Sequence, residues 1–178
     1  MKADLSDNLI LIGMPASGKS TIGVILAKIL GYDFLDTDLL IQKAAGKRLE
    51  EIIEERGVDG FLTLENEICA NLTAERSVIA TGGSVVYGRG AMENLQKLGR
   101  IIYLHTEYPV LERRLRNIRQ RGVVLRDGQT LQELYDTRTR LYEQYADLTV
   151  REERGEIEDT VDRICKVLEE VGRQQDDL

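Results

Sequence analysis

The residue types and spacing most able to do chemistry lie in residues 13–20, with the sequence GMPASGKS. They match the phosphate-binding pattern G-x-x-x-x-G-K-[ST] at every fixed position. A glycine-rich turn of this kind lets backbone N–H groups close around phosphate oxygens at the positive end of a helix dipole. Lys19 would reach the β- and γ-phosphates, and the Ser20 hydroxyl would bind Mg²⁺. The segment therefore predicts a nucleoside triphosphate site, to which we assign Gly13, Ala16, Ser17, Gly18, Lys19, Ser20 and Thr21.

Two carboxylates follow the next apolar segment, at Asp36 and Asp38. In an extended chain, residues two apart point to the same side, so both carboxylates can face one site. One member of such a pair can hold a Mg²⁺-bound water and the other a hydroxyl group. We assign Asp36 to the metal and Asp38 to a hydroxyl. The alternative is that Asp38 only caps the helix that follows.

A second glycine-rich turn, TGGS, covers residues 81–84. Gly82 and Gly83 leave backbone N–H groups accessible and let a small ligand approach closely. The alternative is a tight turn without any ligand contact. With Ser84, these glycines are candidate contacts for the molecule that receives the phosphate.

Eight arginines fall between positions 113 and 140 of an otherwise acidic chain. Phosphoryl transfer needs positive groups where charge develops, and a mobile loop can deliver them while excluding water. Arg121 lies in a glycine-flanked segment without apolar periodicity, residues 120–130, and is the best candidate for that role. For any one of these arginines the alternative is a solvated helix face. His105 has no evident nucleophile or metal partner, and we expect it to be structural.

The elements that must position these residues form an alternating pattern. Predicted strands cover residues 9–12, 32–35 (ending at Asp36), 77–80, 100–104 and 148–150. Predicted helices cover residues 21–30, 39–45, 49–56, 61–74, 92–98, 110–119, 131–145 and 157–171, with breaks at Gly46, Gly57 and Gly60. The pattern indicates an α/β fold with five parallel strands and helices on both faces. Ligands of such sheets bind beyond the carboxyl ends of the strands, where the candidate residues lie.

Composition narrows the class of protein further. The 178 residues favour one domain, and a net charge of −7 argues against a general nucleic-acid or membrane surface. Cys69 and Cys165 lie far apart and are expected to be reduced thiols. The polar, acidic start of the chain does not resemble a signal peptide. We expect a cytoplasmic protein that is a monomer or a weak dimer and binds neither nucleic acid nor membrane.

Taken together, these motifs resemble the shikimate kinase family of P-loop proteins. The resemblance covers nearly the whole chain, through residues 13–23, 36–38 and 80–83, Phe61 with Glu65, Arg121 and Arg138. It implies a P-loop kinase fold with a helical substrate-binding region at about residues 38–74 and a mobile lid at about residues 119–130. It also implies ATP as co-substrate and Mg²⁺ as cofactor. By position, Lys19, Asp38 and Arg121 match the catalytic groups, and Ser20 and Asp36 match the metal site.

The same resemblance assigns the two ligand sites. Arg114 lies where the family often places an arginine against the adenine ring, and Arg121 matches the lid arginine. Arg138 looks like one of two arginines that hold the substrate carboxylate, and the second is replaced by Leu62. A leucine cannot imitate a bidentate arginine–carboxylate contact. Ser84 replaces a third glycine of the family. Both departures fall in the acceptor pocket, to which we assign Asp38, Gly82, Gly83, Ser84 and Arg138.

The leading hypothesis is an ATP- and Mg²⁺-dependent kinase that phosphorylates a hydroxyl of a small, anionic metabolite. Shikimate is the first acceptor to test, with another hydroxy acid as a close variant. A nucleoside or nucleotide kinase on the same fold is a second hypothesis, although seven Tyr, two Phe and no Trp offer few rings to stack a second base. A nucleotide-binding regulatory protein without an acceptor is a third, and Leu62 is the residue that favours it.

Overall fold

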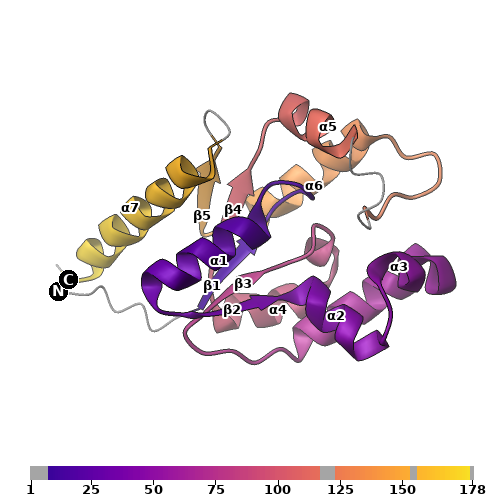
Figure 1. Cartoon of the computed structure of the whole chain (residues 1–178), viewed down its shortest axis with the longest axis horizontal. Coiled ribbons are helices and arrows are strands. Elements are labelled where there is room, and N and C mark those ends of the chain that lie inside the picture. The colour runs from indigo at the N-terminus through magenta and orange to yellow at the C-terminus, as the bar shows by residue number, and fades with distance from the viewer. Residues whose placement is uncertain (1–7, 117–122, 153–155, 177–178) are drawn as a thin grey trace.

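A sheet of five parallel strands forms the centre of the computed structural model, which describes residues 8–116, 123–152 and 156–176 (Figure 1). The strands are β1 (Asn8–Ile12), β2 (Asp33–Asp36), β3 (Ser77–Ala80), β4 (Gly99–His105) and β5 (Leu148–Arg151). Their order is β2-β3-β1-β4-β5, and every neighbouring pair is parallel. The α/β fold with a five-stranded parallel sheet is therefore confirmed.

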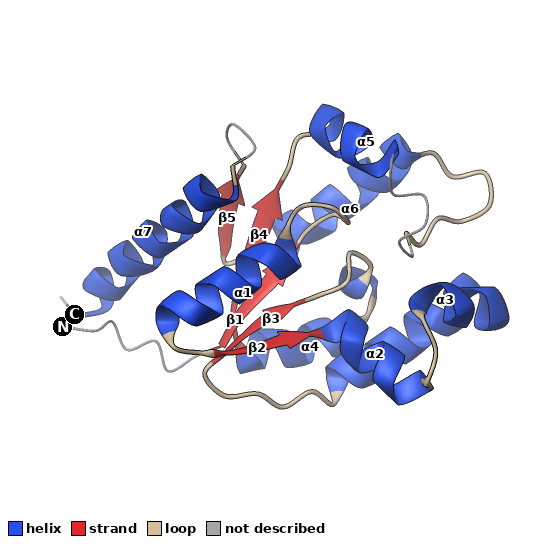
Figure 2. Ribbon diagram, in the orientation of Figure 1, coloured by secondary structure: helices blue, strands red, loops and turns tan. Residues whose placement is uncertain are grey.

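Helices cover both faces of the sheet, as Figure 2 shows. In β1, Leu9 and Leu11 pack with α1 (Lys19–Leu30) and α7 (Ile157–Asp176). Ile10 and Ile12 face the opposite layer, built from α4 (Arg89–Leu98) and α6 (Leu131–Tyr145) with the end of α3 (Leu49–Ala70). Successive side chains of a strand point to opposite faces, so a strand covered on both sides is apolar throughout.

Two helices extend beyond the sheet beside the carboxyl end of β2 (Figure 1). They are α2 (Thr37–Ala45) and α3, and they share a separate apolar cluster centred on Ile41, Ile52 and Phe61. Val124 completes this cluster from the segment before α6. Two further elements are α5 (Tyr108–Arg116) and the single 3-10 turn η1 (Val85–Tyr87).

The helix α3 differs from the prediction in two ways. We expected breaks at both Gly57 and Gly60, and only Gly57 leaves the helical conformation, with a φ of 70°. That positive φ favours glycine, and Gly57 separates two helical segments of α3 across a kink, as predicted. The predicted end at residue 74 was also wrong, because α3 stops at Ala70 and Asn71 turns back to bond the Glu67 carbonyl. The predicted last residues of α5, 117–119, lie outside the described residues.

The amino ends of three strands are joined by the buried side chain of Asn8. Its Nδ2 donates to the carbonyls of Ala74 and Leu98, at 2.8 and 2.9 Å, just before β3 and β4. Its Oδ1 accepts from the Ser77 N–H at 2.9 Å. Gly99 packs so closely that a Cβ there would lie 2.1 Å from the Asn8 carbonyl oxygen. One amide group therefore fixes the edge of the sheet opposite the candidate site.

None of the described helices is both long and apolar enough to cross a bilayer.

Candidate active site

The candidate residues meet at the carboxyl edge of three adjacent strands. Residues 13–20, which we call the phosphate loop, follow β1, while Asp36 ends β2 and residues 81–84 follow β3. Because β2, β3 and β1 are neighbours in the sheet, segments far apart in the sequence converge there. The fold thus brings together the two carboxylates, the glycine turn and the phosphate loop.

The phosphate loop has the backbone that its sequence predicts. Gly13 has a φ of 151°, and a Cβ there would lie 2.7 Å from the Leu104 carbonyl oxygen. Ala16 and Gly18 also have positive φ values, 64° and 86°. Gly18 is the N-cap of α1, and no side chain among the described residues caps this helix. The first N–H groups of α1 thus remain available to an anion, as its dipole favours.

Lys19 is folded back onto the phosphate loop. Its Nζ donates to the carbonyl oxygens of Gly13 and Met14, at 2.8 and 2.7 Å. Burial lowers the pKa of Lys19 to about 8, and the nearby carboxylates of Asp38 and Asp36 oppose this shift. A buried ammonium with only partial charge compensation is suited to a polyanionic ligand.

Asp36 bridges the start of α1 and the start of α2. Its Oδ2 accepts from the Ser20 hydroxyl at 2.8 Å, and its Oδ1 accepts from the Asp38 N–H at 2.9 Å. The residue that caps α2 is thus Asp36, and the alternative of a cap by Asp38 was wrong. An extended N-cap accepts the N–H two residues on, which leaves the Asp38 side chain for the cavity.

The oxygens of Ser20 and Asp36 fit a Mg²⁺ ion by their chemistry. Mg²⁺ prefers hard oxygen ligands and keeps several waters, and it is usually held by one or two protein groups plus substrate phosphates. No group of three or more His, Cys, Asp or Glu side chains that could hold a metal occurs in the described part of the chain. The two oxygens therefore fit an ion that arrives with the nucleotide.

A cavity of about 240 Å³ lies between the phosphate loop and the glycine turn. Lys19, Asp38, Gly82, Gly83 and Ser84 line it, and so do Ser20 and Thr21. Burial, with a smaller contribution from Asp36, raises the pKa of Asp38 to about 6. At neutral pH the carboxylate of Asp38 is therefore ionised and can accept a proton or a hydrogen bond from a hydroxyl.

Glu65 is a site residue that sequence reasoning did not assign. The Ser84 hydroxyl donates to its Oε2 at 2.6 Å, and burial raises the pKa of Glu65 to about 7. A Cβ on Gly82 would lie 2.6 Å from Glu65 Oε1 and 2.8 Å from Asp38 Oδ1. A side chain at position 82 would therefore displace one or both of these carboxylates. The sequence signal that could have identified Glu65 was its place with Phe61 in the motif that resembles the family.

Arg138 lies behind Gly83, where a Cβ would be 3.0 Å from its Nη1, and it does not itself line the cavity. It is 1% exposed, its Nη2 donates to the Val124 carbonyl at 3.0 Å, and its guanidinium carbon lies 5.4 Å from the centre of the Tyr87 ring. Its Nε has no hydrogen-bond partner among the described residues. Leu62 instead packs against the apolar cluster of α2 and α3, so it adds apolar surface where an arginine was expected from the resemblance.

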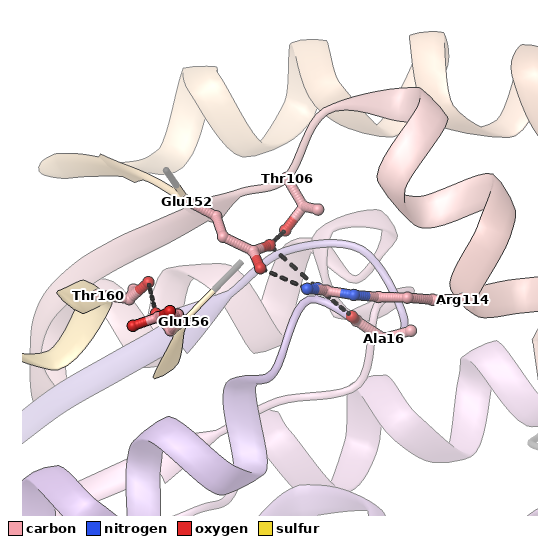
Figure 3. A network of polar contacts seen from close by, with 6 residues as sticks. All are labelled: Ala16, Thr106, Arg114, Glu152, Glu156 and Thr160. Carbon is pink, nitrogen blue, oxygen red and sulfur yellow. Dashed lines mark hydrogen bonds and ion pairs between the residues drawn. The ribbon is translucent and has the colours of Figure 1, made fainter. Parts of the chain in front are cut away.

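A second cavity, also of about 240 Å³, lies on the other side of the phosphate loop. It shares Ala16 and Gly18 with the first cavity and also contains Ser17. Arg114 lines it, in an ion pair with Glu152 and with its Nη1 donating to the Ala16 carbonyl at 3.1 Å (Figure 3). His105 also lines it, so the expectation of a purely structural residue stays untested. Arg121 falls outside the described residues.

A phosphate loop at the carboxyl edge of a parallel sheet, with two acidic side chains opposite its lysine, defines the class of P-loop phosphotransferases. The comparisons with known proteins narrow this class. The family model described as shikimate kinase matches residues 15–169. The chain belongs to the shikimate kinase family, and it is a phosphotransferase with an alcohol group as acceptor.

Three similar proteins illustrate this membership. A shikimate kinase of Clostridium botulinum is 40% identical over 145 residues, which cover 77% of this chain and 83% of that protein. A shikimate kinase of Nostoc punctiforme is 38% identical over 173 residues, 94% of each chain. The structure of a shikimate kinase from Acinetobacter baumannii in complex with shikimate has a TM-score of 0.84 and 30% identity, and covers 93% of this chain and 94% of its own.

Proposed function

We propose that this protein transfers the γ-phosphate of ATP to a hydroxyl of shikimate or of a closely similar hydroxy acid. The observation that carries the proposal is the cavity that Lys19, Asp38 and the glycine turn line together. One side of that cavity can hold the transferred phosphate and the other an accepting hydroxyl. The Acinetobacter baumannii protein, whose structure contains shikimate, has the same fold over almost the whole chain.

The residues would act mainly by positioning and charge stabilisation. Lys19 and the N–H groups at the start of α1 would hold the β- and γ-phosphates. Asp38 would orient the accepting hydroxyl and take its proton. Ser20 and Asp36 would hold Mg²⁺, which when bound neutralises phosphate charge. Arg121 remains our candidate for a lid group.

The acceptor pocket favours a substrate with one anionic group. Arg138 carries a buried guanidinium whose Nε has no hydrogen-bond partner in the described part of the chain. We therefore expect this guanidinium to bind one carboxylate of the acceptor. Leu62 provides no second guanidinium, so we expect a weaker grip on that carboxylate than two arginines would give. Gly82 and Gly83 would bring the backbone close to the acceptor.

An acceptor screen with a gain-of-function variant tests this proposal. Shikimate, quinate and related hydroxy acids are offered with ATP and Mg²⁺ to the wild type and to Leu62→Arg. A new charge-assisted contact should lower the KM for shikimate by about tenfold. Thr63→Arg is the matched control, because it places the same charge at an exposed position of α3 and should leave that KM unchanged.

The outcomes separate the activity from the substrate. Phosphorylation of another hydroxy acid but not shikimate would keep the kinase and change its acceptor. No phosphorylation of any compound by a wild type that still binds ADP would contradict the proposed function and favour a nucleotide-binding regulatory protein.

We also propose a cytoplasmic monomer or weak dimer. Both cysteines are free thiols in the structure, which fits a reducing compartment. Sedimentation at micromolar concentration would test the oligomeric state.

A further inference from the structure

The carboxylate of Glu152 joins four segments around the second cavity (Figure 3). Its Oε2 accepts from the Thr106 hydroxyl at 2.9 Å and from Arg114 Nη1 at 3.0 Å, and its Oε1 pairs with Arg114 Nη2. Thr106 follows β4, Glu152 follows β5, and Arg114 belongs to α5. Arg114 Nη1 in turn donates to the carbonyl of Ala16 in the phosphate loop.

Glu152 is more deeply buried than its ion-pair partner Arg114. The Glu152 side chain is 12% exposed and the Arg114 side chain 31%. A bidentate contact of this kind fixes the plane of the guanidinium, which a single hydrogen bond does not. Without Glu152, a long and flexible side chain would have to be ordered by the Ala16 carbonyl alone. The orientation of Arg114 therefore depends on Glu152.

Arg114 contacts the phosphate loop at the Ala16 carbonyl, so the orientation of its guanidinium affects the loop there. Ala16 has a φ of 64°, which costs free energy for a residue with a Cβ. Its carbonyl accepts from Arg114, and the next N–H, that of Ser17, donates to the Met14 carbonyl at 3.2 Å. Arg114 thus helps to hold an unfavourable peptide orientation in the loop.

We propose that Glu152 is a positioning residue for the donor nucleotide. It acts through Arg114, which it holds against both the phosphate loop and the cavity that takes the nucleoside half. The phosphate loop separates the two cavities, and Asp38 and the glycine turn line the other one, so the nucleoside belongs beside Arg114. The inference rests on the proposed function, since it requires that the phosphate loop binds a nucleotide.

Calorimetric titration with ADP and Mg²⁺, without any acceptor, tests the role of Glu152. Glu152→Ala should raise the Kd for ADP by about tenfold, a loss of one charge-assisted contact. Glu152→Gln keeps an oxygen for Thr106 and should lose less, about threefold. Glu156→Gln is the matched control, because Glu156 is an exposed glutamate near the same end of the sheet and should leave the Kd unchanged.

A double-variant cycle distinguishes positioning from a general structural effect. If Glu152 acts through Arg114, adding Glu152→Ala to Arg114→Ala weakens ADP binding no further than Arg114→Ala alone. Steady-state kinetics of Glu152→Ala should show a raised KM for ATP with the acceptor KM within twofold of wild type.

Three results would overturn the proposal: a Kd for ADP within twofold of wild type in Glu152→Ala, additive effects of the two substitutions, or a lowered melting temperature as the sole change. Failure of the proposed function can be distinguished from failure of this inference. The proposed function is tested by phosphorylation of an acceptor, whereas the role of Glu152 is tested by the Kd for ADP.

Discussion

Burial changes the protonation of Lys19, the residue that we propose binds the phosphates of the nucleotide. Its pKa is lowered to about 8, first by desolvation, so close to half of the molecules carry a neutral amine at pH 8. The same Nζ is occupied by the carbonyls of Gly13 and Met14. A bound polyphosphate favours the charged form, so nucleotide binding and protonation of Lys19 must be linked.

We predict proton uptake on nucleotide binding at pH 8. Because the bound phosphates raise the pKa of Lys19 above the pH, wild type should take up about half a proton more than Lys19→Arg, whose guanidinium is always charged. The difference should vanish at pH 6.5, where Lys19 is already protonated. Titration calorimetry in buffers of different ionisation enthalpy measures the uptake. Equal uptake by both proteins at pH 8 would contradict the prediction.

The phosphate loop, Asp36 and Asp38 could be predicted from the sequence because each motif is contiguous. The partners of the site residues could not. Ser84 meets Glu65 from 19 positions away, and Arg114 meets Glu152 from 38 positions away. No periodicity or spacing in the sequence predicts either contact. The folded structure is needed to show that Ser84 donates to Glu65.

At the scale of elements, Asp36 serves a helix cap with one oxygen and offers the other to the proposed metal site. Oδ1 caps α2 and Oδ2 accepts from Ser20. Asparagine keeps a capping oxygen and loses the charge, while alanine loses both. The two substitutions therefore separate the two roles.

We predict that Asp36→Ala lowers the free energy of unfolding by about 1 kcal/mol, while Asp36→Asn stays within about 0.5 kcal/mol of wild type. Both variants should need more Mg²⁺ for half-maximal activity, because both lose the anionic ligand. Urea unfolding and a Mg²⁺ titration of the reaction measure the two effects. An Asp36→Asn protein with a wild-type Mg²⁺ requirement would remove Asp36 from the metal site.

The type of an element could be predicted where its apolar pattern extended over many residues. The boundaries of the elements were predicted less accurately. Each predicted strand is present, because short apolar runs bounded by turns have few other uses in an α/β chain. The break at Gly57 was predicted, whereas the end of α3 at Ala70 was not, because apolar residues continue along the sequence to Ala74. Gly60 resembles Gly57 in sequence, and only the φ values distinguish them.

At the scale of the whole molecule, the buried acids of the site make folding depend on pH. Burial raises the pKa of Glu65 from near 4.5 to about 7, so the folded protein holds this proton more tightly than the unfolded chain. The resulting stabilisation is complete below pH 4.5 and is lost as the pH rises through 7. Asp38, with its pKa near 6, adds in the same direction.

We predict that Glu65→Gln reduces the loss of unfolding free energy between pH 6 and pH 8 by about 1 kcal/mol. Glutamine can still accept from Ser84 and has no charge to desolvate. Urea unfolding at the two pH values measures the difference. Glu67→Gln, an exposed position two residues on, is the control and should behave as wild type. A pH dependence unchanged in Glu65→Gln would show that this carboxyl is not the source.

The contacts of Asn8 bear on how such a protein changes during evolution. They fasten the amino edge of the sheet with groups that take no part in the proposed chemistry. Substitutions near the proposed acceptor pocket, such as those at position 62 in α3 and at position 84 after β3, leave these contacts of Asn8 intact. Residues at the carboxyl edge can therefore change to accept new substrates, while the contacts at the amino edge keep the arrangement of the strands.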